Sequence, residues 1–245
     1  MKQFGLIGFP LGHSFSKKYF TEKFEREGIN AAYNLYPIEN VSQFSTLTPN
    51  DELCGINVTI PYKEQIIKYL DELDETVAQI GAVNVVKFIR SNEKLILKGY
   101  NSDAIGFENS IKPFLHSYHQ KALILGTGGA SKAIYYVLEK LGIEVTFVSR
   151  TAKQGVLTYD EITEDVICDN LLIINASPVG TFPKSDECPA IQYQFISNKH
   201  LLYDVVYNPT ETLFLKKGKE QGAQCLNGQE MLIGQAEAAW KIWNE

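Results

Sequence analysis

The stretch Leu123–Ala133 reads LILGTGGASKA and sets three glycines directly after a run of apolar residues. The apolar run predicts a strand, and the residues after the glycines have the periodicity of a helix. Strand, glycine turn and helix in this order are typical of a dinucleotide site, because missing side chains let a pyrophosphate approach the helix N-terminus. The third glycine of the usual G-x-G-x-x-G pattern falls at Ser131. A glycine turn without a ligand is the competing interpretation, and the strand and helix around it favour the dinucleotide.

Short apolar runs alternate with helical patterns along the rest of the chain. This alternation predicts an α/β fold with largely parallel sheets. A strand, a glycine turn and a helix are expected within residues 121–142. Further strands are expected at residues 4–9, 31–38, 55–60, 82–89, 94–101, 144–149, 171–177 and 200–207, helices at 16–28, 63–73 and 229–243, and a polar turn at 90–93.

The pattern restarts near residue 103, which indicates two α/β domains. We expect a substrate-binding and catalytic domain with a mostly parallel sheet at residues 1–102 and 228–245, with the last helix returning to it. Residues 103–227 are expected to form a Rossmann-type nucleotide-binding domain. Ligands of such folds lie outside the carboxyl ends of the strands, so we expect the site in a cleft between the domains.

The composition excludes several classes of function. The chain has 245 residues, a formal net charge of −6, 44% hydrophobic residues and 21% charged residues. These proportions suit a soluble globular protein, and the negative charge argues against nucleic acid as the main partner. Four widely spaced cysteines without a C-x-x-C pair predict reduced thiols in a cytoplasmic protein and no metal site. No apolar segment approaches the length of a membrane span, so no membrane partner is expected.

The strand expected at residues 144–149 ends without an acidic side chain. An NAD site usually places Asp or Glu there to bond the ribose 2′-hydroxyl. Here the strand ends in Ser149, followed by Arg150, Thr151 and Lys153. An arginine suits a 2′-phosphate, because its planar guanidinium forms paired charge-assisted bonds. We therefore predict NADP rather than NAD as the cofactor; a solvated arginine after a strand is the alternative.

Residues 55–64, GINVTIPYKE, combine an apolar strand pattern with polar side chains. Because strand side chains alternate in direction, Asn57 and Thr59 share the face opposite Ile56 and Val58. At a strand end these two side chains would bond hydroxyls or a carboxylate. Lys63 follows at the start of the expected helix. Taken alone, these residues favour a solvated lysine over a catalytic one.

Other polar residues change that balance. Ser16 could cap the helix that follows, which leaves Ser14 for a ligand. Asn84 lies within an apolar strand pattern, where a buried amide needs a partner, and Asp103 lies where the two halves of the chain meet. On the last helix, Gln235 interrupts an apolar face. Hydroxyl, amide, lysine and carboxylate groups beside a dinucleotide site suit a small polyhydroxylated acid.

In order and spacing, these motifs resemble the shikimate dehydrogenase family over nearly the whole chain. The resemblance implies reversible reduction of 3-dehydroshikimate to shikimate with NADPH, on the chorismate route to aromatic amino acids. It implies a small-molecule substrate, and a monomer or homodimer is expected. The matching stretches are GFPLGHSFS, GINVTIPYK, GAVNVV, GYNSDAIGF, LGTGGASKA, SRT, NASPVGTFP, DVVYNPTETLFL and NGQEMLIGQAEAAW.

The resemblance also implies roles for individual residues. Lys63 and Asp103 match the family's catalytic pair, with Lys63 as the proton-transfer group. Substrate contacts are implied for Ser14, Ser16, Asn57, Thr59, Asn84, Tyr207 and Gln235. Cofactor contacts are implied for Gly126, Gly128, Gly129, Ala130, Ser149, Arg150, Thr151, Lys153, Val205 and Gly228.

The chain departs from the family pattern at four positions, and two other functions compete with the first. Lys17, Ser102, Ser149 and Thr181 stand where the family usually has Pro, Thr, Asn and Met. The first alternative is a quinate/shikimate dehydrogenase with broader substrate and cofactor use. The second is a catalytically idle paralogue that binds NADP or the acid. The presence of both Lys63 and Asp103 argues against an idle paralogue, because a binding protein needs no proton donor.

Overall fold

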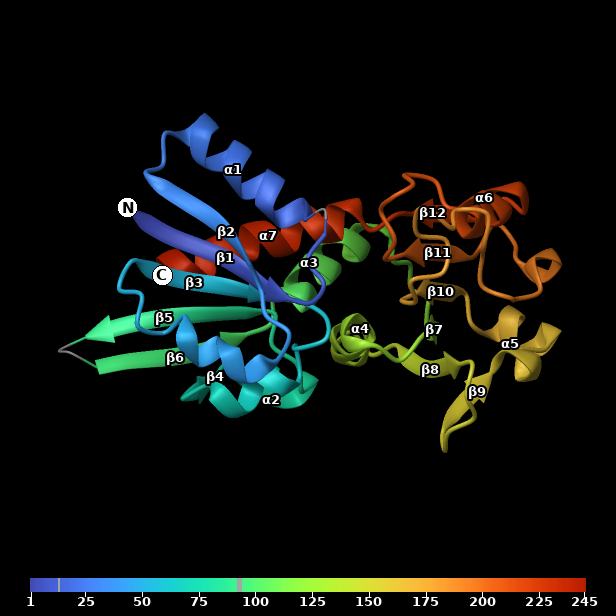
Figure 1. The fold of residues 1–245 in the computed structure, drawn as a ribbon. Coiled ribbons are helices and arrows are strands. Elements are labelled where there is room, and N and C mark those ends of the chain that lie inside the picture. Colours follow the sequence, from blue (N-terminus) through green and yellow to red (C-terminus); the bar gives the residue numbers. More distant parts are fainter. Residues whose placement is uncertain (13, 92–93) are drawn as a thin grey trace. The chain divides into compact units, whose positions relative to one another are not determined.

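The computed structural model describes residues 1–12, 14–91 and 94–245. The chain folds into two compact units, and each unit contains one six-stranded sheet (Figure 1). Unit 1 comprises Met1–Ser102 and Ala236–Glu245, and unit 2 comprises Asp103–Gln235. The predicted α/β fold class is confirmed. In this division the chain re-enters unit 1 at Ala236, within the last helix, whereas the expected boundary lies at residue 228.

The sheet of unit 1 mixes parallel and antiparallel pairs, with the strand order β2-β1-β3-β5-β6-β4. The pairs β1/β2, β1/β3 and β4/β6 are parallel, whereas β3/β5 and β5/β6 are antiparallel. The strands are β1 (Lys2–Gly8), β2 (Ala31–Pro37), β3 (Leu53–Val58), β4 (Glu72–Leu73), β5 (Val85–Ser91) and β6 (Lys94–Tyr100).

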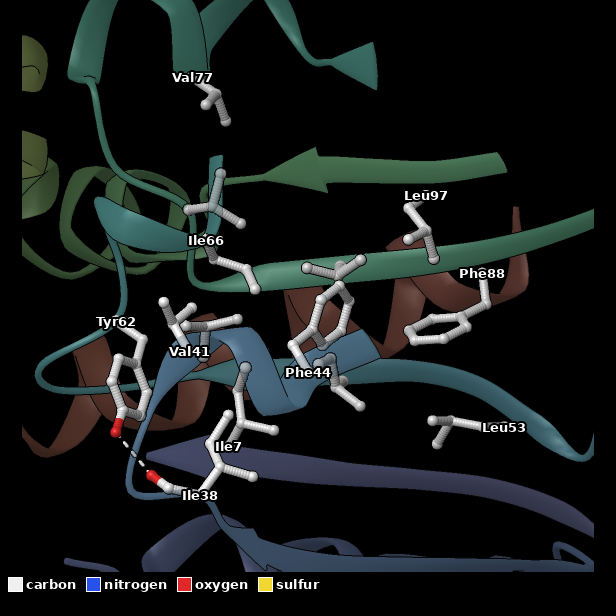
Figure 2. Close-up of a cluster of buried hydrophobic side chains, with 14 residues drawn as sticks. Ile7, Ile38, Val41, Phe44, Leu53, Tyr62, Ile66, Val77, Phe88 and Leu97 are labelled. Atoms are coloured by element: carbon white, nitrogen blue, oxygen red, sulfur yellow. Dashed lines mark hydrogen bonds between the residues drawn. The ribbon is translucent and has the colours of Figure 1, made fainter. Parts of the chain in front are cut away.

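A hydrophobic core lies on each face of this sheet. Side chains along each strand alternate in direction, so neighbouring residues contribute to different cores. Phe4 and Leu6 of β1 pack against α1 (Phe15–Glu27) and the second half of α7 (Gln229–Asn244), where Trp243 is buried. Ile7 lies in the second core (Figure 2), which is covered by η1 (Val41–Thr46), η2 (Gln65–Tyr69) and α2 (Glu75–Ile80). Ile56 and Val58 of β3 also lie in this second core. Asn57 therefore faces the α1 and α7 side.

The sheet of unit 2 is parallel throughout, with the order β12-β11-β10-β7-β8-β9. When β7 is counted as strand one, this is the 3-2-1-4-5-6 order of a Rossmann fold, which reverses between β7 and β10. The strands are β7 (Lys121–Leu125), β8 (Glu144–Ser149), β9 (Val156–Thr158), β10 (Leu172–Asn175), β11 (Leu201–Asp204) and β12 (Gln224–Leu226). The other elements of this unit are α3 (Ser102–Ile111), η3 (Lys112–Phe114), α4 (Gly129–Lys140), η4 (Tyr159–Glu161), α5 (Glu164–Asp169), η5 (Tyr193–Phe195) and α6 (Leu213–Glu220).

Two sequence-based expectations about local structure are wrong. Residues 63–73 do not form one helix, because η2 is a five-residue 3-10 helix and β4 follows it at Glu72–Leu73. Asn84 lies before the first residue of β5 rather than inside the strand. The polar turn expected at residues 90–93 includes Asn92 and Glu93, which lie outside the described residues.

Candidate functional site

A pocket of about 290 Å³ lies at the switch point of the sheet in unit 2. The turn after β7 and the segment after β10 form two of its sides, and the end of β8 forms a third. In a doubly wound sheet this is where a nucleotide binds. The residues that line the pocket are Gly126, Thr127, Gly128, Val148, Ser149, Arg150, Tyr159, Ala176, Ser177, Pro178 and Val179.

The glycine turn has the backbone geometry of a phosphate-binding loop. Gly126 has a φ of +118°, and a Cβ built on it would lie 3.1 Å from the backbone of Ala176. Gly128 is the N-cap residue of α4, and a Cβ there would meet nothing within 4 Å. Ser131, at the place of the third glycine, is fully buried and its hydroxyl donates to the carbonyl of Gly128. At Gly126 and Gly128 the turn thus presents backbone and a helix N-terminus to the pocket.

The end of β8 supplies a cation and a hydroxyl to the same pocket. Arg150 lines it, and Ser149 Oγ accepts a hydrogen bond from the backbone N–H of Thr151 over 3.2 Å. Tyr159, from η4, is a lining residue that the sequence interpretation missed. Burial raises the pKa of Tyr159, and the nearby charge of Arg150 opposes this effect.

A buried hydrogen-bond network supports the segment after β10. Asn175 Nδ2 donates to Asp204 Oδ1 over 3.0 Å and to the carbonyl of Val179 over 3.2 Å. Its Oδ1 accepts from the backbone N–H and the hydroxyl of Ser177, over 3.1 and 2.6 Å. Asp204 Oδ2 accepts from the hydroxyl of Thr212 over 2.5 Å. Asp204 and Asn175 hold the pocket-lining residues Ser177 and Val179 in place.

The remaining residues of the expected cofactor set are not among the pocket-lining residues. Gly129 and Ala130 begin α4, and Thr151 and Lys153 are exposed after β8. Gly228 is buried against Val205, another residue of the expected cofactor set. A Cβ at position 228 would lie 2.0 Å from the carbonyl oxygen of Val205. The glycine at 228 is required by this close approach of two backbone segments.

Unit 1 contains a chain of buried polar side chains behind the carboxyl ends of its parallel strands. The Tyr33 hydroxyl donates to Asn57 Oδ1 over 2.7 Å, and Asn57 Nδ2 donates to the carbonyl of Asn84 over 3.3 Å. The side chain of Asn84 bonds both the hydroxyl and the backbone N–H of Ser102, over 3.0 and 2.7 Å. Two expected substrate residues, Asn57 and Asn84, are therefore neighbours in one network.

Of the two serines in the GHSFSKK stretch, Ser14 caps the helix, whereas the sequence suggested Ser16 for this role. Ser14 is the N-cap residue of α1, and its Oγ accepts from the backbone N–H of Lys17 over 3.2 Å. Ser16 lies in the first turn of the helix, near enough to Tyr33 to lower the pKa of its hydroxyl. His13, in the same stretch, lies outside the described residues.

Thr59 and Lys63 lie in the segment that follows β3, next to the residues before β5. The backbone N–H of Thr59 donates to the carbonyl of Ile7 over 2.9 Å, and the carbonyl of Lys63 accepts from Val83 N over 2.7 Å. Lys63 is half-buried and precedes the short helix η2. The backbone bond to Val83 brings Lys63 next to Asn84.

Three of the expected catalytic and substrate residues belong to unit 2. Asp103 is buried in the first turn of α3, and Tyr207 is exposed after β11. Gln235, on α7, donates from Nε2 to the carbonyl of Leu232 over 3.1 Å. Its helix lies close to α3, because a Cβ on Gly106 would meet the backbone of both Met231 and Gln235 within 2.8 Å.

Comparison with known proteins places the chain among enzymes with a known reaction. Residues 6–86 match the model of the shikimate dehydrogenase substrate binding domain. The shikimate dehydrogenase (NADP(+)) of Methanosphaera stadtmanae is 38% identical over 98% of this chain and 90% of its own. The chain belongs to the shikimate dehydrogenase family.

Solved structures of shikimate dehydrogenases share the fold of this chain. The crystal structure from Aquifex aeolicus is 37% identical, covers 99% of this chain and 92% of its own, and has a TM-score of 0.87. The structure from Thermus thermophilus in complex with NADP(H) and shikimate is 26% identical, covers 99% and 93%, and has a TM-score of 0.85. Likeness to both shikimate dehydrogenases extends over the whole chain.

Other kinds of site find no support in the described part of the chain. No group of three or more His, Cys, Asp and Glu side chains there could hold a metal ion. Across residues 1–12, 14–91 and 94–245, no helix has the length and apolar character needed to cross a membrane.

Proposed function

We propose that this chain catalyses the reversible, NADP-dependent reduction of 3-dehydroshikimate to shikimate, a step in the formation of chorismate and the aromatic amino acids. The observation that carries the proposal is the 38% identity, over 98% of the chain, to an enzyme named shikimate dehydrogenase (NADP(+)). The pocket at the switch point of unit 2 supports the same function, because it offers a nucleotide site of the expected kind.

The residues of this pocket fit NADP. Gly126 and Gly128 leave the N-terminus of α4 open to a pyrophosphate. Arg150 lines the pocket at the end of β8, where no acidic side chain follows the strand. A guanidinium there would pair with a 2′-phosphate. We therefore assign unit 2 to the cofactor and unit 1 to the substrate, with Ser149, Thr151 and Lys153 completing the cofactor side.

We assign the substrate contacts to the polar residues that the family resemblance implies. Asn57 and Asn84, held in their buried network, would bond the hydroxyls of the acid. The remaining contacts in this assignment are Ser14, Ser16, Thr59, Tyr207 and Gln235. Such a set of hydroxyls and amides matches a polyhydroxylated carboxylic acid better than an apolar or phosphorylated substrate.

Lys63 and Asp103 are the catalytic residues of the proposal. Bound NADPH supplies the hydride that reduces the ketone carbon. Lys63 donates a proton to the ketone oxygen as negative charge develops there, and it takes that proton back in the oxidative direction. Asp103, the second residue of the pair that the family resemblance implies, has the role of orienting the groups between which the proton moves. A positioned acid or base of this kind contributes about 10²–10⁴-fold in rate.

We place the reaction in the cytoplasm, as a monomer or homodimer. All four cysteines are free thiols, which fits a reducing compartment. Analytical ultracentrifugation of the purified protein distinguishes the two oligomeric states.

The main rival is a quinate/shikimate dehydrogenase that also uses NAD. Quinate lacks the ring double bond and carries an additional hydroxyl, so a pocket that bonds that hydroxyl could separate the two acids by about 10⁴–10⁵-fold. Arg150 favours NADP, and therefore the biosynthetic enzyme. The second rival, an idle paralogue, would bind NADP without turnover.

The deciding experiment measures NADPH or NADH formation with shikimate and with quinate. Turnover with shikimate and NADP alone supports the proposal. Comparable turnover with quinate or NAD would replace it with the broader enzyme. Absence of turnover in all four assays, with NADP-dependent stabilisation against heat, would establish the idle paralogue instead.

A further inference from the structure

Tyr33, on β2, contacts two elements that carry expected substrate contacts, β3 and α1. Its hydroxyl donates to Asn57 Oδ1 of β3 over 2.7 Å, and Ser16 of α1 is near enough to lower the pKa of this hydroxyl. Tyr33 is 1% exposed, and its ring stacks on Phe20 with centroids 4.8 Å apart. Because Ser16 and Phe20 are one helical turn apart, the face of α1 that covers the ring also carries Ser16.

The hydrogen bonds of Asn57 specify the orientation of its amide. Oδ1 accepts from Tyr33, and Nδ2 donates to the carbonyl of Asn84 over 3.3 Å. A rotation of the amide by half a turn would set Oδ1 against the carbonyl of Asn84, where two acceptors repel. An amide carries two N–H groups, and the bond to Asn84 uses one. The second N–H then has a fixed direction.

The tyrosine hydroxyl is able to act as this donor because it keeps its proton. Burial raises the pKa of Tyr33 above its ordinary value, and the nearby Ser16 side chain opposes this effect. The partner of Tyr33 also distinguishes it from Tyr62 of the same unit. The hydroxyl of Tyr62 donates to a backbone carbonyl, that of Ile38, over 2.6 Å (Figure 2). A backbone carbonyl satisfies a buried hydroxyl without orienting any side chain, whereas the bond of Tyr33 orients an amide.

We propose that Tyr33 is a positioning residue for the substrate, which fixes the amide of Asn57 so that its second N–H donates to a hydroxyl oxygen of the bound acid. This inference rests on the proposed function, because it takes Asn57 as a substrate contact. Tyr33 itself touches no substrate in this arrangement. Its role is to prevent the amide from presenting its oxygen instead.

The test uses Tyr33→Phe, which keeps the stacked ring and removes only the hydroxyl. Without that donor Asn57 Oδ1 loses a buried partner, and the two amide orientations become closer in energy. We expect the KM for shikimate to rise by about tenfold or more, with the KM for NADP unchanged and kcat changed less. A KM for shikimate equal to that of the wild type would overturn the inference.

The matched control is Tyr203→Phe. Tyr203 is also fully buried, and its hydroxyl lies 2.7 Å from that of Ser110, with neither residue assigned to a ligand. Both variants lose one hydrogen bond of a buried tyrosine, so both should have a lower melting temperature than the wild type. Only Tyr33→Phe should change the KM for shikimate. An equal change in both variants would mean that lost stability causes the effect, and the positioning role would be rejected.

A spectroscopic measurement separates this inference from the proposed function. The side-chain NH2 signals of Asn57 in the ligand-free protein, assigned through their loss in Asn57→Asp, report the environment and rotation of the amide. In Tyr33→Phe these signals should shift and broaden, and in Tyr203→Phe they should not. Unchanged signals in Tyr33→Phe would refute the inference even if the wild type oxidises shikimate. If the signals change in Tyr33→Phe but the wild type does not oxidise shikimate, the orientation of Asn57 by Tyr33 is supported and shikimate is rejected as the substrate.

Discussion

Asn175 and Asp204 end two adjacent parallel strands at the same level of the sheet, and their side chains are hydrogen-bonded over 3.0 Å. The side chain of Asn175 also forms hydrogen bonds with the backbone of Ser177 and Val179, which line the pocket. Asp204 is fully buried and accepts from Asn175, from Thr212 and from the backbone N–H of Val206. A buried carboxylate thus supports a pocket that it does not touch.

We predict that Asp204 makes the protein more stable as the pH falls from neutral toward about 4. Burial raises the pKa of Asp204 to about 6, although hydrogen bonds from Thr212, Val206 and Asn175 lower it. In the unfolded chain this carboxyl titrates near about 3.9. Between these two pKa values the folded state holds a proton that the unfolded state lacks. The free energy of unfolding therefore rises as the pH falls through the folded-state pKa, and this gain is lost as the pH rises through it again.

The measurement compares melting temperatures of the wild type and Asp204→Asn at about pH 7.5 and about pH 4.5. The wild type should gain stability relative to the variant at the lower pH. Burial lowers the pKa values of His119 and His200, which oppose this trend, but both proteins contain them and their effect cancels in the comparison. A difference that stays constant over this range would show that Asp204 has an ordinary pKa.

Lys63→Ala should lower kcat by at least about 10²-fold, because the reaction loses its positioned proton donor. The KM for shikimate should change less. Steady-state kinetics in both directions provide the measurement. Lys68→Ala is the control, since Lys68 is an exposed lysine of η2 to which no role at the site is assigned. A kcat close to that of the wild type would remove Lys63 from its assigned role.

Arg150→Ala should weaken NADP selectively. A hydrogen bond to a charged group contributes about 1.5–3 kcal/mol, which corresponds to a rise of roughly 10- to 100-fold in the KM for NADP. The KM for NAD, which lacks the 2′-phosphate, should be nearly constant and serves as the internal control. Arg26→Ala, at an exposed ion pair with Glu27 in unit 1, should change neither value. An equal rise in the KM values for NADP and NAD would contradict a 2′-phosphate contact.

Gly126→Ala and Gly128→Ala should separate folding from cofactor binding. An alanine at 126 meets both a positive φ and the backbone of Ala176, so the melting temperature should fall. An alanine at 128 meets no protein atom within 4 Å, so folding should change by about 1 kcal/mol or less. Its methyl group would nevertheless occupy space in the pocket.

Isothermal titration with NADP and thermal unfolding of both glycine variants provide the two readouts. For Gly128→Ala we expect weaker NADP binding at a nearly unchanged melting temperature. Undiminished affinity in that variant would place the pyrophosphate elsewhere.

The nucleotide half of the molecule was predictable because its signals are local. Gly126, Gly128 and Arg150 stand within short stretches whose strand and helix flanks are visible in the sequence, and all three line the pocket. The buried hydrogen bonds that hold this pocket in place were not predictable. Asp204 and Asn175 meet only through strand pairing, and nothing in their local sequence indicates that contact.

The substrate half shows where local patterns fail. Tyr33 lies in a strand rich in apolar residues, and only the register that sets β1 between β2 and β3 brings its hydroxyl to Asn57. The expected helix at residues 63–73 has helical periodicity, but β4 pairs with β6 there and tertiary pairing overrides the local preference. Ser14 rather than Ser16 caps α1, a difference of two residues that helix-start signals do not resolve.

The core of unit 1 contains residues from both ends of the chain. Trp243 packs on Phe4, and its indole N–H donates to the carbonyl of Val86 over 3.2 Å. During synthesis, the whole of unit 2 therefore leaves the ribosome before unit 1 receives its last helix. Although domains generally complete folding from the N-terminus onward, here the first unit to be translated is the last that can close its core. A released chain that ends before Ala236 would contain every strand of the unit 2 sheet, attached to a unit 1 with an uncovered aromatic face.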